Sequence, residues 1–245
     1  MSKSIIITGA SSGIGAATAT AFLEAGWQVG LIARRQEALE DVASGHAAAH
    51  VLPADVTNEE ALVDAFATFV AVTDRIDVLF NNAGSFGPAG LIDEISVEDW
   101  RAVVDLNLTG MFLAARLAFA QMRMQDPQGG RIINNGSVSA RAPRPGSVGY
   151  TSTKHAITGL TKTLSLDGRA FDIACGQIDI GNAQTELLDQ LNSRALATDP
   201  DATLQPMMDV GIAANSILNM AELPLSANVQ FMTIMATKMP LIGRG

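Results

Sequence analysis

The chain has 245 residues, of which 48% are hydrophobic and 17% charged. This composition suits an α/β protein with a sizeable buried core and excludes general disorder. The formal net charge is −9, and the sequence has no Lys/Arg cluster that would form a basic face for nucleic acid. We therefore expect no nucleic-acid partner. Cys175 is the only cysteine, which excludes an intrachain disulfide and fits a cytoplasmic protein. We see no signal-peptide pattern and no membrane-length apolar run, and expect neither a membrane partner nor a metal ion.

Short apolar or β-branched runs alternate with longer amphipathic stretches along most of the chain. The expected strands are Ser4–Thr8, Gln28–Ala33, His50–Ala54, Val78–Asn81, Arg131–Asn135 and Ile173–Ile180. The expected helices lie near residues 13–26, 36–44, 58–73, 96–124 and 150–170. This alternation is typical of βαβ units with right-handed crossovers, and it predicts an α/β fold with a doubly wound parallel sheet and helices on both faces. No linker or repeat interrupts it, so we predict a single domain over residues 1–245.

The last third of the chain is less regular. Residues 184–209 are polar and are expected to form a substrate loop or lid, because ligands of open α/β sheets bind beyond the carboxyl ends of the strands. A helix is expected at about 207–221, and a final strand at Val229–Met235 within a C-terminal strand and tail of residues 223–245. A tail this apolar would expose a hydrophobic patch if it ended at solvent, so we expect it to pack on a second subunit in a homo-oligomer. Alternatively, the strand closes the edge of its own sheet and the last eight residues are loose. Both can hold at once, with the strand in the sheet and the final residues crossing to a partner.

A glycine-rich turn joins the first expected strand to the first helix. It reads Thr8-Gly9-Ala10-Ser11-Ser12-Gly13-Ile14-Gly15. Gly9 lets the chain turn, Gly13 lets the backbone approach a pyrophosphate, and Gly15 allows the helix to pack closely on the strand. The helix N-terminus offers unpaired N–H groups and a positive dipole end to phosphates. The turn therefore predicts a dinucleotide site, although its glycine spacing differs from G-x-G-x-x-G.

Tyr150 and Lys154 lie four residues apart and share one face of an expected helix. A nearby cation favours the phenolate, so we expect Lys154 to lower the pKa of Tyr150 and make it a proton donor or acceptor for a carbonyl/alcohol pair. Such pairs also occur by chance on protein surfaces. Ser137 strengthens the interpretation, because it follows an expected strand and its hydroxyl can hold the substrate oxygen.

With these motifs the chain resembles the short-chain dehydrogenase/reductase family from residue 4 to about residue 185. Thr8–Gly15 matches the family's glycine-rich turn, Asn81–Gly84 its N-N-A-G segment, and Asn107 its structural and catalytic asparagine. The remaining catalytic positions are matched by Ser137, Tyr150 and Lys154. The resemblance implies a Rossmann-type fold and favours a homodimer or homotetramer. It also implies an oxidoreductase that transfers a hydride between a nicotinamide dinucleotide and a small carbonyl or alcohol substrate.

The resemblance also implies a role for each matched residue. Tyr150 would be the general acid in reduction and the base in oxidation, Lys154 would bind the nicotinamide ribose, and Ser137 would orient the carbonyl. Asn107 would hold a water that links Lys154 to solvent, or it could simply cap or bend its helix. The expected cofactor-binding residues are Gly9, Ser11, Ser12, Gly13, Ile14, Gly15, Arg34, Arg35, Asp55, Val56, Asn82, Ala83, Gly84, Tyr150, Lys154, Gly181, Ala183 and Thr185.

The end of the second strand bears on the choice of cofactor. Ala33 stands where an NAD-binding chain carries a carboxylate, and Arg34 and Arg35 follow it. Because guanidinium binds phosphate in a bidentate manner, this segment favours NADP(H) over NAD(H). Alternatively, the two arginines begin a solvated helix. Asp55 resembles the family's acid near the adenine, with Val56 packing against the base.

Two segments depart from the family pattern. Ile180 stands where a proline usually precedes Gly181, and we expect cofactor binding to survive with an aliphatic side chain there. The C-terminal segment lacks the usual glycine-rich stretch and is loosely similar to that of members acting on 3-hydroxy acids.

Position alone nominates the residues of the substrate pocket, which are Phe86, Ser139, Pro143, Ser147, Asn182, Leu187 and Leu188. Arg141 and Arg144 could meet an anionic substrate, although such loop arginines are more often solvated. Two other functions stay open. A non-catalytic NADP-binding sensor should have lost Tyr150 or Lys154, whereas a sugar-nucleotide epimerase or dehydratase is typically a longer chain with a different glycine spacing.

Overall fold

The computed structural model describes residues 2–185, 188, 192–193, 196–197 and 204–242. Within them, seven parallel strands form one sheet in the order β3-β2-β1-β4-β5-β6-β7. The strands are β1 (Ser4–Thr8), β2 (Gln28–Ala33), β3 (Ala49–Pro53), β4 (Val78–Asn81), β5 (Gly130–Asn135), β6 (Ile173–Ile180) and β7 (Phe231–Ile234). The helices are α1 (Gly13–Glu24), α2 (Gln36–Ala43), α3 (Glu59–Thr73), α4 (Val97–Val104), α5 (Gly110–Met124), α6 (Val148–Asp167) and α8 (Val210–Glu222).

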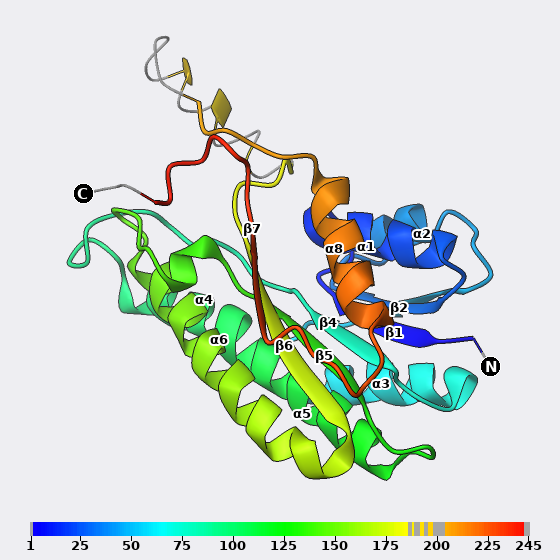
Figure 1. Ribbon diagram of the computed structural model, residues 1–245. Coiled ribbons are helices and arrows are strands. Elements are labelled where there is room, and N and C mark those ends of the chain that lie inside the picture. The colour runs from blue at the N-terminus through cyan, green and yellow to red at the C-terminus, as the bar shows by residue number, and fades with distance from the viewer. Residues whose placement is uncertain (1, 186–187, 189–191, 194–195, 198–203, 243–245) are drawn as a thin grey trace.

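Helices cover both faces of the sheet, and β1 shows why (Figure 1). Successive side chains of a strand point to opposite faces. Ile5 and Ile7 accordingly pack in a cluster with α1, α2 and α8, whereas Ile6 packs in a second cluster with α3 and α5. All three isoleucines are fully buried. A parallel sheet buried on both faces therefore explains the near-continuous apolar strands of this sequence, and the doubly wound α/β prediction is confirmed.

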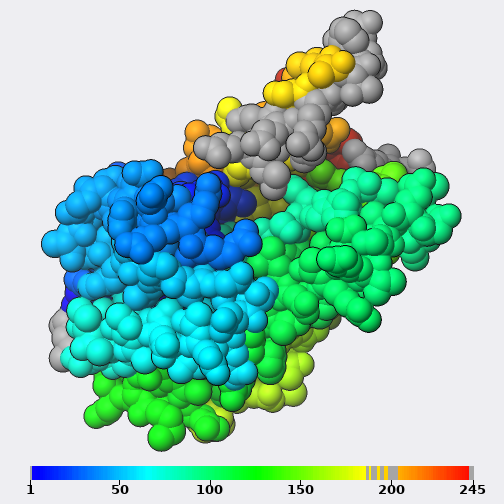
Figure 2. All heavy atoms as spheres, turned by 180° about the vertical axis from the view of Figure 1, so that it is seen from behind, coloured from blue at the N-terminus to red at the C-terminus, as the bar shows by residue number. Residues whose placement is uncertain are grey.

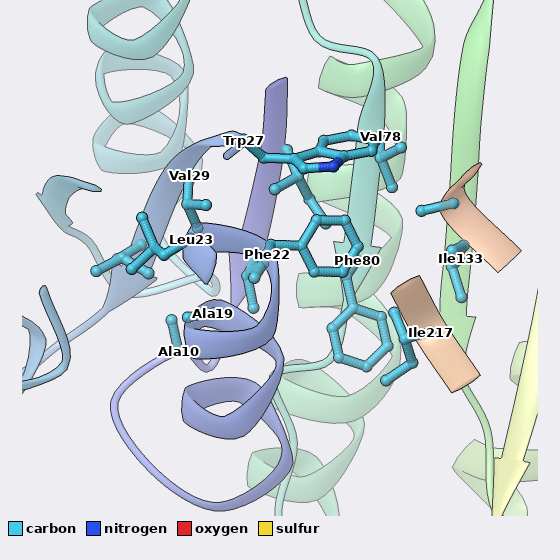
Figure 3. Packing of buried hydrophobic residues seen from close by; sticks show 14 of the residues in the cluster. Ala10, Ala19, Phe22, Leu23, Trp27, Val29, Val78, Phe80, Ile133 and Ile217 are labelled. Carbon is cyan, nitrogen blue, oxygen red and sulfur yellow. The ribbon is translucent and has the colours of Figure 1, made fainter. Parts of the chain in front are cut away.

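Large side chains anchor the α1 face of the sheet. Phe22 of α1 meets Trp27 edge to face, with ring centroids 4.9 Å apart and planes at 78° (Figure 3). The same cluster contains Phe80 of β4 and Ile217 of α8. α8 lies near the end of the sequence, yet it packs beside α1, so the C-terminal part of the chain fixes the helix that follows the glycine-rich turn. Seen from behind, the blue and cyan N-terminal segments form one side of the surface and the green segments the other (Figure 2).

The strand order reverses between β1 and β4. β1 pairs with β2 on one side and with β4 on the other, so the following helices leave in opposite directions. Such a reversal opens a crevice at the carboxyl ends of the two strands, where ligands of open α/β sheets bind. The glycine-rich turn follows β1 at this point, and Asn82 follows β4.

The helix expected at 96–124 is interrupted. A π-helical turn at Asp105–Thr109 separates α4 from α5. Val97–Met124 as a whole is long and apolar enough to cross a membrane by length and composition, with a window of mean hydropathy 1.4. The buried face of α5 packs against β4 and β5, and Asn81 donates a 2.7 Å hydrogen bond to the Met111 carbonyl. We therefore interpret this stretch as a helix packed on the sheet.

The other element boundaries differ from the expectations by a few residues. β3 runs from Ala49 to Pro53, one residue earlier than expected. α6 begins at Val148 and gives way to a 3₁₀ turn at Gly168–Phe171. The final strand is shorter than Val229–Met235, because β7 pairs only with the last four residues of β6, Gln177 to Ile180.

Part of the described tail after β7 packs on its own chain. Ala236 and Met239 are buried in a cluster with Val138, and Leu241 packs against it. β7 closes the edge of its own sheet, as in the alternative interpretation, but Met239 and Leu241 are packed on the same chain rather than loose. Beyond β7, Ile242 is the one strongly exposed large hydrophobic side chain among the described residues. The expected lid at 184–209 lies partly outside the described residues. Its two ends are joined by a hydrogen bond from the Gln184 amide to the Met208 carbonyl.

Candidate active site

A cleft of about 520 Å³ opens at the carboxyl edge of the sheet, over the point where the strand order reverses. It is large enough for a sizeable ligand, since ligand pockets span about 300–1,000 Å³. All the expected cofactor-binding residues line it, together with Ser137. The expected substrate residues that line it are Phe86, Ser139, Asn182 and Leu188. The cleft thus joins the glycine-rich turn to the tyrosine and lysine in one continuous site.

The three glycines of the turn each have a distinct steric reason. Gly9 has a φ of +68°, and a Cβ there would come within 2.9 Å of the Ala83 Cα. A Cβ on Gly15 would collide with the Gly9 carbonyl oxygen. Gly13 has a φ of +54° and faces Thr185. No acidic residue lies in the first turn of α1, so the N–H groups and positive dipole end are open to an anion.

Asn82 ties the turn to the neighbouring strands. Its amide nitrogen donates to the Thr8 carbonyl at 2.9 Å, and the Thr8 hydroxyl accepts from the backbone N–H groups of Asn82 and Ala83 at 2.9 and 3.0 Å. Its side-chain oxygen accepts a 2.7 Å bond from the amide of Asn135. These bonds hold the ends of β1, β4 and β5 in register beneath the cleft.

The expected catalytic residues Ser137, Tyr150 and Lys154 meet at one end of the cleft. Tyr150 and Lys154 share a face of α6, and the ammonium lies 5.6 Å from the centre of the phenol ring. Lys154 donates a 2.7 Å hydrogen bond to the Asn135 carbonyl. Ser137 hydrogen-bonds Tyr150, and the ring of Phe86 stacks at a tilt on the phenol with centroids 4.5 Å apart. A proton donor and a hydroxyl are therefore directed at the same point.

Burial dominates the titration of this pair. Desolvation lowers the pKa of Lys154 to about 8, although the charge of Asp179 acts in the opposite direction. The pKa of Tyr150 is raised from its usual value, chiefly by burial, while the hydrogen bond from Ser137 and the charge of Arg144 lower it. In the cofactor-free protein the net shift of the Tyr150 pKa is therefore upward, and not toward neutral pH as expected from the nearby Lys154. Removal from water disfavours the phenolate more than nearby cations favour it.

Asn107 does not line the cleft. It lies in the π-helical turn, fully buried, and its side chain exchanges two 2.8 Å hydrogen bonds with the backbone of Ser85. Its amide nitrogen also lies 3.3 Å from the Thr153 hydroxyl, one residue before Lys154. The helix departs from α geometry at this residue, as π-turns do at functional sites. Asn107 therefore fixes the loop beyond Gly84 against α6.

The sequence analysis missed a buried carboxylate beneath Ser137. Asp179 is 1% exposed, accepts from the Ser137 N–H at 3.2 Å and from the Gln177 side chain at 2.6 Å, and pairs with Arg141 at 3.3 Å. A Cβ on Gly136 would collide with this carboxylate. The signal was present in the sequence, because Gln177 and Asp179 are polar residues in an otherwise apolar strand. Their alternation puts both on one face.

Some expected substrate residues are not brought to the cleft. Pro143 is exposed, and Ser147 uses its hydroxyl for the Arg144 carbonyl at 2.7 Å as it precedes α6. Neither lines the cleft. Leu187 lies outside the described residues. Ile180, which replaces the family's proline, is buried at the end of β6, and the Gly181 amide bonds the Ile234 carbonyl at 2.7 Å.

Comparison with known proteins identifies the family. The family model for short chain dehydrogenase matches residues 3–196. The chain belongs to the short-chain dehydrogenase family. A 2-(R)-hydroxypropyl-CoM dehydrogenase of Xanthobacter autotrophicus is 34% identical to this dehydrogenase over 221 residues, which cover 87% of this chain and 88% of that protein. Sulfoacetaldehyde reductase 2 of Chromohalobacter salexigens is 30% identical, with 97% and 96% covered.

Solved structures share the fold. A structure described as ElxO with NADP bound superposes with a TM-score of 0.86 at 26% identity, covering 96% of this chain and 98% of that one. An actinorhodin polyketide ketoreductase with NADPH superposes with a TM-score of 0.87 at 24% identity, with 96% of each chain covered. The Rossmann-type fold of the family is therefore confirmed for this chain.

The depressed pKa of Lys154 predicts a pH-dependent stability. In the unfolded chain its pKa is about 10.4, so between about pH 8 and 10 the unfolded chain binds a proton that the folded chain releases. The free energy of unfolding contributed by this residue therefore rises with pH, by up to about 1.4 kcal/mol per pH unit. Urea unfolding of the cofactor-free wild type and of Lys154→Met at pH 7.5 and pH 9.5 measures it. Tyr150 and Asp179 remain in both proteins. If the free energies of unfolding of the two proteins differ by the same amount at both pH values, burial does not lower the pKa of Lys154.

Proposed function

We propose that this protein is an NADP(H)-dependent oxidoreductase acting on the carbonyl or alcohol group of a small molecule, with Tyr150 as general acid and base. The observation that carries the proposal is the single cleft that joins the anion-binding turn at one end to Ser137, Tyr150 and Lys154 at the other. The relatives support the reaction class, since they are named dehydrogenases and reductases.

The residues of the cleft fit a dinucleotide. The open N–H groups at the start of α1 suit a pyrophosphate, and the positive φ values of Gly9 and Gly13 give the turn a backbone path that other residues rarely adopt. Asp55 and Val56 line the cleft near the end of β3, on the side away from Tyr150. The Asp55 carboxylate is held by the backbone and hydroxyl of Thr57 at 2.9 and 2.8 Å. When bound, the nicotinamide would supply or accept the hydride.

The protein's own residues would handle the proton. In reduction, the substrate carbonyl would accept hydrogen bonds from the hydroxyls of Ser137 and Tyr150. As the carbonyl carbon gains a hydride, its oxygen takes the Tyr150 proton and the product leaves as an alcohol. Lys154 stabilises the resulting phenolate by its charge, and its bond to the Asn135 carbonyl fixes the ammonium in place. Phe86 packs against the phenol ring and restricts its orientation.

Replacing Tyr150 tests the proton donor. Tyr150→Phe retains the ring and its packing on Phe86, so NADPH binding should change little. Turnover should fall about 10²–10⁴-fold, the usual contribution of a general acid. NADPH absorbance with a panel of ketones, aldehydes and alcohols gives turnover, and fluorescence titration gives cofactor affinity. A variant that keeps a third of the wild-type rate would rule out Tyr150 as the acid.

The preference for NADP(H) rests on the residues after β2. Ala33, Arg34 and Arg35 all line the cleft, and no carboxylate stands among them to accept bonds from the ribose hydroxyls. An arginine at this edge suits the additional 2′-phosphate of NADP(H).

Removing Arg34 tests this preference. A charge-assisted hydrogen bond contributes about 1.5–3 kcal/mol, so Arg34→Ala should weaken NADPH binding about ten- to a hundredfold. NADH lacks the 2′-phosphate, and its affinity should barely change. Arg101→Ala, an exposed arginine of α4 that does not line the cleft, controls for the lost charge. A wild-type protein that binds NADH more tightly than NADPH would overturn the preference.

We also propose a homo-oligomer, supported by exposed apolar side chains. Trp100 of α4 and Phe112 of α5 are 38% and 49% exposed, whereas Ala236, Met239 and Leu241 of the tail pack on their own chain. Replacing both Trp100 and Phe112 with Asp should yield a monomer, whereas a chain ending at Lys238 should keep the oligomeric state of the wild type. Light scattering after size exclusion at micromolar concentration gives the molecular mass of the wild type and of each variant. A monomeric wild type would refute the assembly, and a monomer caused only by the truncation would assign it to the tail.

A further inference from the structure

Arg144 stands beside the catalytic residues without being one of them. It lies in the loop between Ser137 and Tyr150 and lines the cleft. Its guanidinium donates a 2.8 Å hydrogen bond to the side-chain oxygen of Asn182. Asn182 lies in the loop after β6 and also lines the cleft. The positive charge is close enough to Tyr150 to lower the pKa of the phenol. A cation therefore faces the reaction centre from the substrate side.

Asn182 leaves a hydrogen-bond donor unused at the same place. The residue is 5% exposed, and its side-chain nitrogen has no hydrogen-bond partner among the described residues. The orientation of the amide is fixed by chemistry, because a guanidinium only donates and the atom facing Arg144 must be the oxygen. The nitrogen is thus the atom left over. A buried unpaired donor is costly, which points to an acceptor supplied by a ligand.

The charge distribution along the cleft favours an anion at this end. Among the described lining residues Asp55 is the only carboxylate, and it lies near the end of β3, away from Tyr150. Asp179, the nearest buried carboxylate, does not line the cleft and is occupied by Ser137, Gln177 and Arg141. The remaining substrate-side walls include the apolar side chains of Phe86 and Leu188. A negative group here would meet the donor groups of Arg144 and Asn182.

We propose that the substrate carries an anionic group, a carboxylate or a sulfonate, which binds the guanidinium of Arg144 and the side-chain nitrogen of Asn182 while the carbonyl lies between Ser137 and Tyr150. The inference rests on the proposed function and names its substrate class as small oxo acids and hydroxy acids. The two donors and Tyr150 border one end of the same cleft, so the anionic group is separated from the reacting carbon by a short spacer. Because the whole chain has a net charge of −9, the positive charge of Arg144 distinguishes this end of the cleft from the protein as a whole.

Matched pairs of substrates test the proposal. The pairs are acetoacetate with methyl acetoacetate, and sulfoacetaldehyde with methylsulfonylacetaldehyde, each differing in the anionic group. In wild type, kcat/KM should favour the anionic member. Arg144→Gln should lower this anionic-to-neutral ratio about ten- to a hundredfold, and Asn182→Ala about three- to tenfold. Loss of the Arg144 charge also affects Tyr150, but it does so with both members of a pair, so the ratio isolates recognition of the anion.

Two further variants sharpen the result. Arg144→Lys keeps the charge and should recover part of the ratio, whereas Arg101→Gln removes an exposed charge outside the cleft and should leave the ratio unchanged. Calorimetric titration of the NADP⁺-loaded protein with each of these carbonyl compounds measures binding without turnover. Tighter binding of the anionic member, lost in Arg144→Gln, supports the proposal.

The failures are distinguishable. Absence of NADPH oxidation with every carbonyl, together with selective binding of the anions, would contradict the proposed function and leave the anion site standing. Equal kcat/KM and equal binding for both members of each pair would overturn the anion site and leave the oxidoreductase standing. An equal loss for both members in Arg144→Gln would assign Arg144 to the tuning of Tyr150 alone and would also overturn the anion site.

Discussion

A series of hydrogen bonds that runs from Thr8 to Lys154 sets the geometry on which the rest of the structure depends. Thr8 at the end of β1 binds the backbone of Asn82, Asn82 binds Asn135 at the end of β5, and the Asn135 carbonyl holds the ammonium of Lys154. Each strand end would otherwise carry unpaired polar groups, which are costly when buried. The same bonds that complete the sheet edge therefore fix the glycine-rich turn and Lys154 relative to one another.

A second support fixes the other half of the site. The carboxylate of Asp179 accepts the Ser137 N–H and lies so close to Gly136 that only glycine fits. Arg141 caps the carboxylate from the solvent side, with its side chain 57% exposed. A buried charge held by three donors is rigid, because moving any of them leaves it unpaired. Ser137 is thus positioned from below by β6, while Tyr150 approaches from α6.

Removal of water gives this site its chemical character. Tyr150 and Lys154 have shifted pKa values chiefly because both are desolvated, and both shifts favour the uncharged form. A neutral phenol is the form that can donate a proton to a carbonyl oxygen. The charges of Arg144 and Asp179 oppose one another at Tyr150. An anionic substrate group beside Arg144 would weaken the lowering effect of that arginine on the phenol.

The sequence by itself determined the strands, the helix order, the glycine-rich turn and the spacing of Ser137, Tyr150 and Lys154. These follow from local rules, because periodicity, turn chemistry and i,i+4 spacing act over a few residues. Only the tertiary structure decided which distant side chains meet: Asp179 with Ser137, Arg144 with Asn182, Asn107 with Ser85 and the tail with Val138. It also decided the pKa of Tyr150, where burial outweighs the nearby cation. Desolvation depends on everything packed around a group, and no local pattern in the sequence reports that sum.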